Sequence, residues 1–469
     1  MIVGGASLEP PDRMRSAPGP RRPMGRSPPI EPAPPGLAVR IAAAQVLADT
    51  LSHGGSLDER ISSASASGAL AALDGRDRAL VRAIVTAALR RLGTIRKALA
   101  QFLEKGVPRK SGALEWILVA ATAQILFLET PDHAALDLAV RAARVDQNAA
   151  PYAALANGVL RNMIRERQAI LDASDPLDDD TPRWLAARWR KTYGEAEARA
   201  IAAAHRQEPT LDLSVKSDAE EWARRLGGVV LPTGSVRLET HRPILELAGY
   251  EGGEWWVQDA AAALPAKLIG AKPLMRIVDL CAAPGGKTAE LAAAGAHVTA
   301  VDRSAERLKR LAANFERLRL DVEIVVADAL LFAAPLFDAA LLDAPCSATG
   351  TIRRHPDVAW TKRSGDLASL AVLQSQLLDR AVALVKPGGL VVYCACSLEP
   401  EEGEAQIAAL LRRNPDVRRV AIEAREIGGL ADCLNGDGDL RTLPYHLPGT
   451  TPRMSGLDGF FGSRLQRLR

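Results

Sequence analysis

Hydrophobic positions in the first third of the chain recur at steps of three and four residues. The pattern is clearest in Val39–Leu51, Leu80–Leu92, Leu114–Leu128 and Leu136–Ala143. Glycine and proline interrupt it between these stretches, for example at Gly54-Gly55. Such a period is typical of amphipathic helices. We therefore predict an all-α helical bundle over residues 38–168.

The pattern changes after an acidic segment, residues 172–180, that is typical of a linker. Residues 181–209 keep the helical period, whereas Thr210–Lys216 alternates apolar and polar side chains, as a half-buried strand does. Val229–Leu238 is a further strand candidate with a turn in its middle. These elements predict a small α/β adaptor over residues 182–262.

From about residue 263, short apolar runs alternate with helical stretches. The runs are Arg276–Leu280, His297–Val301, Val322–Val326, Ala339–Leu342 and Leu390–Tyr393. This alternation predicts a parallel sheet with helices on both faces, an α/β Rossmann-like domain over residues 263–469. Ligands of such sheets bind beyond the carboxyl ends of the strands.

Composition supports a multidomain globular protein. The chain has 469 residues, 48% of them hydrophobic and 25% charged, with a formal charge of +3. Five cysteines and no secretory leader indicate reduced thiols in the cytoplasm. We expect no membrane span, because no apolar run reaches about 18 residues. We also expect no metal site, because no zinc-ligand spacing is present.

Residues 1–37 are rich in proline, glycine and arginine and lack the apolar core of a signal peptide. We interpret them as a disordered arm. Alternatively, they precede the true start, since Met14 and Met24 follow.

A glycine-containing loop follows the first strand of the predicted sheet. It consists of Cys281, Ala282, Ala283, Pro284, Gly285, Gly286 and Lys287. The two glycines allow a ligand to approach the backbone, and the helix that follows offers free N–H groups to a carboxylate. The plain alternative is a tight strand-to-helix turn.

Acidic residues end the next strands. Asp302 follows the second strand, where a carboxylate can bind two ribose hydroxyls, and Asp328 follows the third, where it can receive an adenine. The loop lacks the G-x-G-x-x-G spacing of nicotinamide-binding proteins and the earlier glycine of a P-loop. A nicotinamide oxidoreductase is therefore disfavoured.

Two cysteines lie at strand ends downstream of this loop. Cys346 ends Asp343-Ala-Pro-Cys346, and Cys396 ends Cys394-Ala-Cys396. A cofactor loop with two separate thiols suggests a methyl donor and a nucleophile, and hence methylation of an unreactive ring carbon. The plain alternative for each thiol is a small buried apolar residue, which we accept for Cys433.

These segments together resemble the Sun/RsmB family of RNA cytosine-5 methyltransferases. The resemblance rests on the loop 281–287 and on the segments 343–350, 353–357, 386–389, 396–402 and 458–461. The helical region resembles a NusB-like RNA-binding domain through residues 77–81, 131–140 and 157–161. The resemblance implies a class I methyltransferase fold, S-adenosylmethionine as cofactor, a small-subunit ribosomal RNA substrate and a monomer.

The resemblance also implies roles for individual residues. Cys396 is the nucleophile that bonds to cytosine, and Cys346 helps to remove the carbon 5 proton and to release the product. Asp343 touches the cofactor and hydrogen-bonds the extruded base. Cys394 departs from the family, which more often has a small hydroxyl residue there, so either thiol could be the nucleophile. The segment Ser-Leu-Glu-Pro that follows Cys396 favours Cys396.

Basic and aromatic residues follow the Cys346 turn. Arg353 and Arg354 are candidates for phosphate contacts and, with Lys362, for stabilising a thiolate. His355 orders its own loop, and Trp360 either stacks on a base or packs in the core. An alternative function is a non-catalytic RNA-binding or ribosome-assembly factor with a degenerate Rossmann domain.

Overall fold

The computed structural model describes residues 34–240 and 242–469. The arm predicted over residues 1–37 therefore lies, up to residue 33, outside the described residues. Leu37 already begins the first helix.

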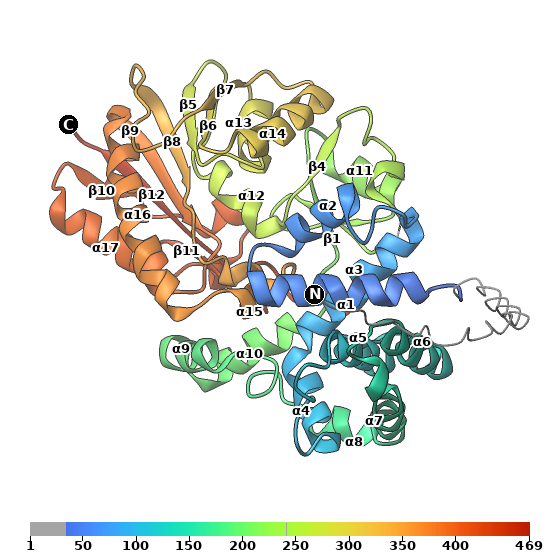
Figure 1. Ribbon diagram of the computed structural model, residues 1–469. Helices are drawn as coiled ribbons and strands as arrows, with labels where there is room; N and C mark the ends of the chain where they lie inside the picture. Colours follow the sequence, from blue (N-terminus) through green and yellow to red (C-terminus); the bar gives the residue numbers. More distant parts are fainter. Residues whose placement is uncertain (1–33, 241) are drawn as a thin grey trace, which may run out of the picture. The chain divides into compact units, whose positions relative to one another are not determined.

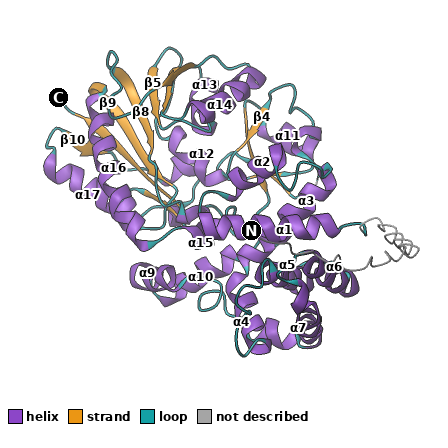
Figure 2. Ribbon diagram, in the orientation of Figure 1, coloured by secondary structure: helices purple, strands orange, loops and turns teal. Residues whose placement is uncertain are grey.

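The N-terminal region is helical, as predicted (Figures 1 and 2). Its helices are α1 (Leu37–His53), α2 (Leu57–Ser67), α3 (Gly75–Arg90), α4 (Leu92–Phe102), α5 (Leu114–Phe127), α6 (Asp132–Val145), α7 (Ala153–Arg165) and α8 (Arg167–Asp172). Helix α5 is apolar on all sides and is buried from Ile117 to Leu126. It therefore forms the centre of the bundle, against which the amphipathic helices pack.

Two helices and a small antiparallel sheet follow. They are α9 (Arg183–Tyr193), α10 (Glu195–His205), β1 (Leu211–Val215), α11 (Ala219–Leu226), β2 (Val229–Val230), β3 (Val236–Leu238) and β4 (Trp255–Val257). The strand order is β2-β3-β1-β4. Leu213, Val236 and Trp255 form its core with Trp222 of α11.

The C-terminal region contains an eight-stranded sheet. Its strands are β5 (Arg276–Leu280), β6 (His297–Asp302), β7 (Glu323–Val326), β8 (Phe337–Asp343), β9 (Val385–Ala395), β10 (Val417–Arg419), β11 (Leu440–Thr442) and β12 (Phe460–Arg467). The order β9-β8-β5-β6-β7 is parallel, which confirms the predicted strands. The sheet also contains antiparallel pairs that the sequence did not predict, because β12 pairs antiparallel with β9, β10 and β11.

Helices cover both faces of this sheet. On one face, α16 (Ser364–Ala383) and α17 (Glu404–Arg413) pack against the apolar side chains of β5, β8 and β9. On the other lie α12 (Ala260–Lys267), α13 (Gly286–Ala293) and α14 (Ala305–Leu318). The short helix α15 (Asp357–Thr361) links the end of β8 to α16. The carboxyl ends of β5, β8 and β9 are thereby brought together.

Over residues 34–240 and 242–469, no helix combines the length and apolar character needed to cross a bilayer. The same residues contain no cluster of three side chains suited to a metal ion. The monomeric state and the cytoplasmic location stay predictions.

Candidate active site

The glycine loop between β5 and α13 lines a cavity of about 690 Å³. Ala282 and the residues from Pro284 to Lys287 face the cavity, whereas Cys281 and Ala283 do not. Gly285 has φ = 102°, and a Cβ there would come within 3.1 Å of the Leu311 side chain. Glycine is therefore required for this turn, which leaves backbone exposed to a ligand.

Asp302 supports the loop from behind rather than from within the cavity. Its carboxylate accepts hydrogen bonds from the N–H groups of Ala283, at 3.2 Å, and Ser304, at 2.9 Å, and pairs with Arg307. Asp328 is exposed and accepts from the N–H of Leu330 at 2.9 Å. Neither carboxylate lines the cavity, so their contacts with a cofactor stay predictions.

Asp279, near the carboxyl end of strand β5, is a site residue that the sequence did not single out. Its side chain lines the cavity, and one carboxylate oxygen accepts a hydrogen bond from Thr288 at 2.6 Å. The other oxygen is buried without a partner among the described residues. Burial raises the pKa of Asp279 to about 7. A buried acceptor of this kind fits an ammonium group, such as that of an amino-acid ligand.

Lys287 carries the positive charge of the site. Its Nζ lies 2.7 Å from Asp343 and 4.7 Å from the centre of the Phe460 ring. Burial alone would lower the pKa of Lys287, but Asp343 and the cysteines Cys394 and Cys396 raise it above the usual value. The ammonium therefore stays charged at neutral pH, and it favours ionised groups around it.

The two predicted thiols meet at the ends of β8 and β9. The Sγ atoms of Cys346 and Cys396 are 3.3 Å apart, and Cys396 lines the cavity. The hydrogen bond with Cys396 and burial raise the pKa of Cys346 well above its usual range. Cys394 is fully buried, donates to Asp343 at 3.5 Å and does not line the cavity. Of these three thiols, Cys396 is therefore the one that lines the cavity.

A buried carboxylate joins the two cysteine loops. Glu402, which is 0% exposed, accepts hydrogen bonds from the N–H of Ser347 at 2.9 Å, the Ser397 hydroxyl at 2.5 Å and the Gln374 amide at 3.1 Å. The Ser347 hydroxyl donates to it as well. Since Ser347 follows Cys346 and Ser397 follows Cys396, Glu402 fixes the distance between the two thiols.

The prediction that Arg353 and Arg354 bind phosphates is wrong. Arg353 is only 2% exposed and donates to the carbonyl of Ser455 at 2.8 Å. Arg354 lines the cavity, but its guanidinium pairs with Asp212, Asp259 and Asp458. Both guanidinium groups therefore hold the adaptor and the sheet together. The positive charge that we expected these arginines to supply near the thiols comes from Lys287 instead.

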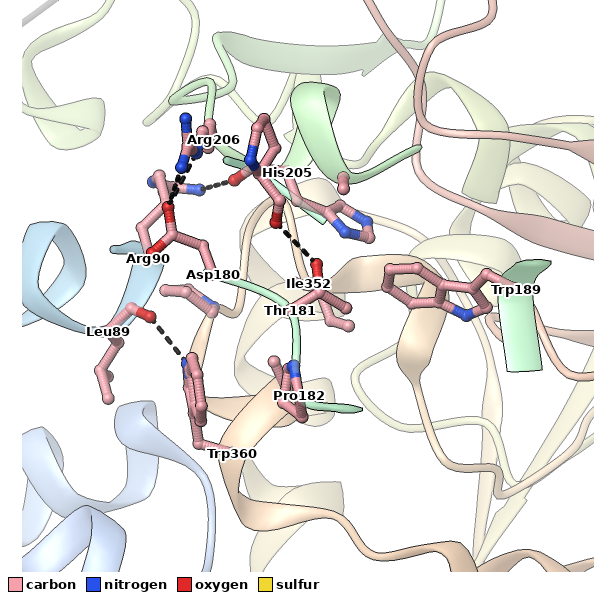
Figure 3. Close-up of a pocket in the computed structure, with 14 residues that line it drawn as sticks. Leu89, Arg90, Asp180, Thr181, Pro182, Trp189, His205, Arg206, Ile352 and Trp360 are labelled. Atoms are coloured by element: carbon pink, nitrogen blue, oxygen red, sulfur yellow. Dashed lines mark hydrogen bonds and ion pairs between the residues drawn. The ribbon is translucent and has the colours of Figure 1, made fainter. Parts of the chain in front are cut away.

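Trp360 packs between regions far apart in the sequence. Its indole N–H donates to the carbonyl of Leu89 at 2.8 Å, as Figure 3 shows. Arg90 donates to the carbonyls of His205, at 3.2 Å, and Arg353, at 2.6 Å. The helical region is thereby fastened to the segment that follows the Cys346 loop.

Sequence comparisons group this chain with methyltransferases. Residues 267–466 match the family model described as 16S rRNA methyltransferase RsmB/F, and residues 37–165 match the NusB family model. Ribosomal RNA small subunit methyltransferase B of Xylella fastidiosa is 37% identical over 449 residues, which cover 92% of this chain and 98% of that protein. The protein of the same description from Vibrio cholerae is 33% identical over 83% of this chain and 93% of its own.

Solved structures share the fold. One described as PH0851 has a TM-score of 0.69 and 23% identity, and the match covers 93% of this chain and 99% of that one. NSun6 from Pyrococcus horikoshii, solved with SFG, has a TM-score of 0.51 and 20% identity over 61% of this chain and 98% of its own.

Proposed function

The chain belongs to the 16S rRNA methyltransferase RsmB/F family, and from this premise we propose that it methylates carbon 5 of a cytosine in small-subunit ribosomal RNA through a transient bond to Cys396. Membership in this family shows that the chain is a ribosomal RNA methyltransferase and that S-adenosylmethionine is its methyl donor. One observation carries the finer proposal. The thiol of Cys396 lines the same cavity as the glycine loop and lies 3.3 Å from the thiol of Cys346.

The cavity suits the donor. The exposed backbone around Gly285 and Gly286 would receive its carboxylate at the start of α13, and the unpartnered oxygen of Asp279 would bind its ammonium group. Asp302 and Asp328 remain our candidates for the ribose and the adenine. When bound, the donor supplies an electrophilic methyl group beside Cys396.

Carbon 5 of cytosine is a poor nucleophile, so the base must first be activated. The Cys396 thiolate adds to carbon 6, and the ring then carries enamine character at carbon 5, which takes the methyl group. The Lys287 ammonium places a positive charge near Cys396, and the Cys346 thiol lies within hydrogen-bond distance of its sulfur. Asp343 also lines the cavity, and we assign it the hydrogen bond to the extruded ring.

Release needs the loss of the carbon 5 proton and cleavage of the bond from carbon 6 to sulfur. Once Cys396 is bonded to the base, its sulfur is no longer a thiolate acceptor for Cys346. Cys346, after giving its own proton to solvent, then takes the carbon 5 proton, and elimination regenerates the Cys396 thiolate. The fixed distance between the sulfurs allows both steps at one base.

The test is transfer of labelled methyl groups from S-adenosylmethionine to unmodified small-subunit ribosomal RNA. Cys396→Ala is expected to lower kcat by about 10³-fold or more, because the covalent step is lost. Cys346→Ala is expected to accumulate a covalent enzyme–RNA adduct, visible as a slowly migrating band on a denaturing gel. Sequencing for 5-methylcytosine assigns the product.

Cys433→Ala is the matched control. This buried cysteine lies outside the cavity and contacts His446 at 3.3 Å, so its removal should leave activity unchanged. Full activity of Cys396→Ala, or a product methylated elsewhere than at carbon 5, would contradict the proposal.

A further inference from the structure

A second hollow is lined by residues at the start of α9 and by residues from the end of α15 to the start of α16. It has a volume of about 360 Å³ and is lined by Trp184 and Trp360, with Lys362 and Arg363 beside them. Its remaining lining residues are uncharged. We call this hollow the tryptophan groove. Its volume is within the range of about 300–1,000 Å³ that is usual for small-ligand sites.

The charges of the groove are unbalanced. Neither Lys362 nor Arg363 has a carboxylate within ion-pair distance among the described residues. The same is true of Arg183, which precedes Trp184, and of Arg96, whose guanidinium lies 6.0 Å from the centre of the Trp360 ring. Most arginines elsewhere in this region are paired, for example Arg190 with Asp178. Two cations without a carboxylate partner, Lys362 and Arg363, beside two aromatic rings indicate an anionic, planar ligand.

The chain leads directly from the active-site cavity to the groove. Thr351, Arg354 and His355 line the active-site cavity, and α15, which begins two residues later, carries Trp360 to the groove. Trp360 is held in place by its hydrogen bond to Leu89 and forms a fixed wall (Figure 3). Trp184 has no hydrogen-bond partner for its indole N–H in the described part of the chain, and its ring is partly exposed.

We propose that the tryptophan groove binds a single-stranded nucleotide of the RNA that flanks the target base. Its base stacks on Trp184 against the wall formed by Trp360, and its phosphates pair with Lys362 and Arg363. Stacking on aromatic side chains combined with cations along the backbone is how proteins hold single strands. This inference rests on the proposed function, because it takes RNA as the substrate, and it adds a contact outside the active-site cavity.

The experiment measures binding and methyl transfer with the full-length protein and unmodified small-subunit ribosomal RNA transcribed in vitro. Trp184→Ala is expected to raise the Kd and KM for this RNA roughly 5- to 100-fold with kcat unchanged, as the loss of one stacked base does. Trp184→Phe should restore the affinity to within a few-fold. Lys362→Glu with Arg363→Glu should weaken binding about tenfold at low salt, and the loss should shrink as salt rises.

Arg425→Glu is the control for a reversed surface charge, since Arg425 is 82% exposed and lies outside the groove. The inference would be overturned if Trp184→Ala and the double variant Lys362→Glu with Arg363→Glu both bound RNA within twofold of the affinity of the unmodified protein. So would a defect seen only on ribosomal particles and not on naked RNA, because the groove would then contact a protein. If the unmodified protein binds RNA through the groove but transfers no methyl group, the proposed function fails and the groove stands.

Discussion

Buried carboxylates at the joint between the adaptor and the sheet have arginine partners, whereas two buried carboxylates at the active site have no cationic partner. At the joint, Asp212, Asp259 and Asp458 face the three guanidinium groups of Arg237, Arg353 and Arg354. At the site, Asp279 and Glu402 have no cation within ion-pair distance among the described residues. Charge is matched at the joint, whereas Asp279, beside the proposed ligand site, and Glu402, between the thiol loops, lack a cationic partner.

The contrast has a physical reason. An ion pair buried between two regions costs desolvation but becomes strongly destabilising only when one partner is removed. A lone carboxylate retains capacity for a further donor, which is what a binding or positioning group requires. Three substitutions test whether the two kinds of carboxylate differ as described.

The largest effect is expected at the joint. Arg237→Ala removes the main partner of Asp212, since their side chains are 1% and 0% exposed and 2.7 Å apart, and leaves three buried carboxylates facing only two guanidinium groups. We expect a loss of about 3–5 kcal/mol in the free energy of unfolding, measured by urea denaturation. The double variant Arg237→Met with Asp212→Leu should regain most of this loss. A double variant as unstable as the single one would show that an unmatched buried carboxylate is not what destabilises Arg237→Ala.

Next in size is the effect of removing Glu402. Glu402→Ala deprives Ser347, Ser397 and Gln374 of their shared acceptor, so the distance between the thiols is no longer fixed. We expect kcat to fall about 100-fold, since misplacement of reacting groups by about 1 Å has that cost, with KM for RNA little changed. The neighbour Glu401, half-exposed and paired with Arg188, is the control; equal losses in Glu401→Ala would argue against a positioning role.

The smallest effect is expected at Asp279. Because the folded protein raises the pKa of this carboxyl to about 7, it binds its proton more tightly than the unfolded chain does. Stability therefore falls as pH rises from about 4 to about 7. Asp279→Asn removes this dependence and should stabilise the ligand-free protein at pH 8 by on the order of 2 kcal/mol.

The same substitution should weaken donor binding about tenfold, the loss of one charged hydrogen bond. Melting temperatures between pH 5 and pH 8 and calorimetry with S-adenosylmethionine measure the two effects. Identical melting curves for both proteins across this range would remove the distinction between matched and unmatched carboxylates.

Local patterns predicted the elements well, and long-range pairing accounts for the errors. The five parallel strands were found because each is a short apolar run between helices. Strand β12 was missed, because its place beside β9 depends on a segment more than sixty residues away. Arg353 and Arg354 were misread for the same reason: Asp212 and Asp259 lie about a hundred residues or more before them.

The site was predicted in part. The loop 281–287, Asp343 and both thiols were named from motifs, and the structure brings Cys346 and Cys396 together. Asp279 had a visible signal, an acid within an otherwise apolar strand. Glu402 had no such signal in the sequence beyond its place in the motif 396–402, because the sequence does not say which of the glutamates in that motif becomes buried.

The hydrogen bonds of Trp360 to Leu89 and of Arg90 to Arg353 have a practical consequence. The methyltransferase domain depends on the helical region. A fragment that starts after the helices would expose the Trp360 indole and would lose the hydrogen bond from Arg90 to the loop that follows Cys346. Fusing the methyltransferase domain to another RNA-binding domain would first require new partners for Trp360 and for the carbonyl of Arg353.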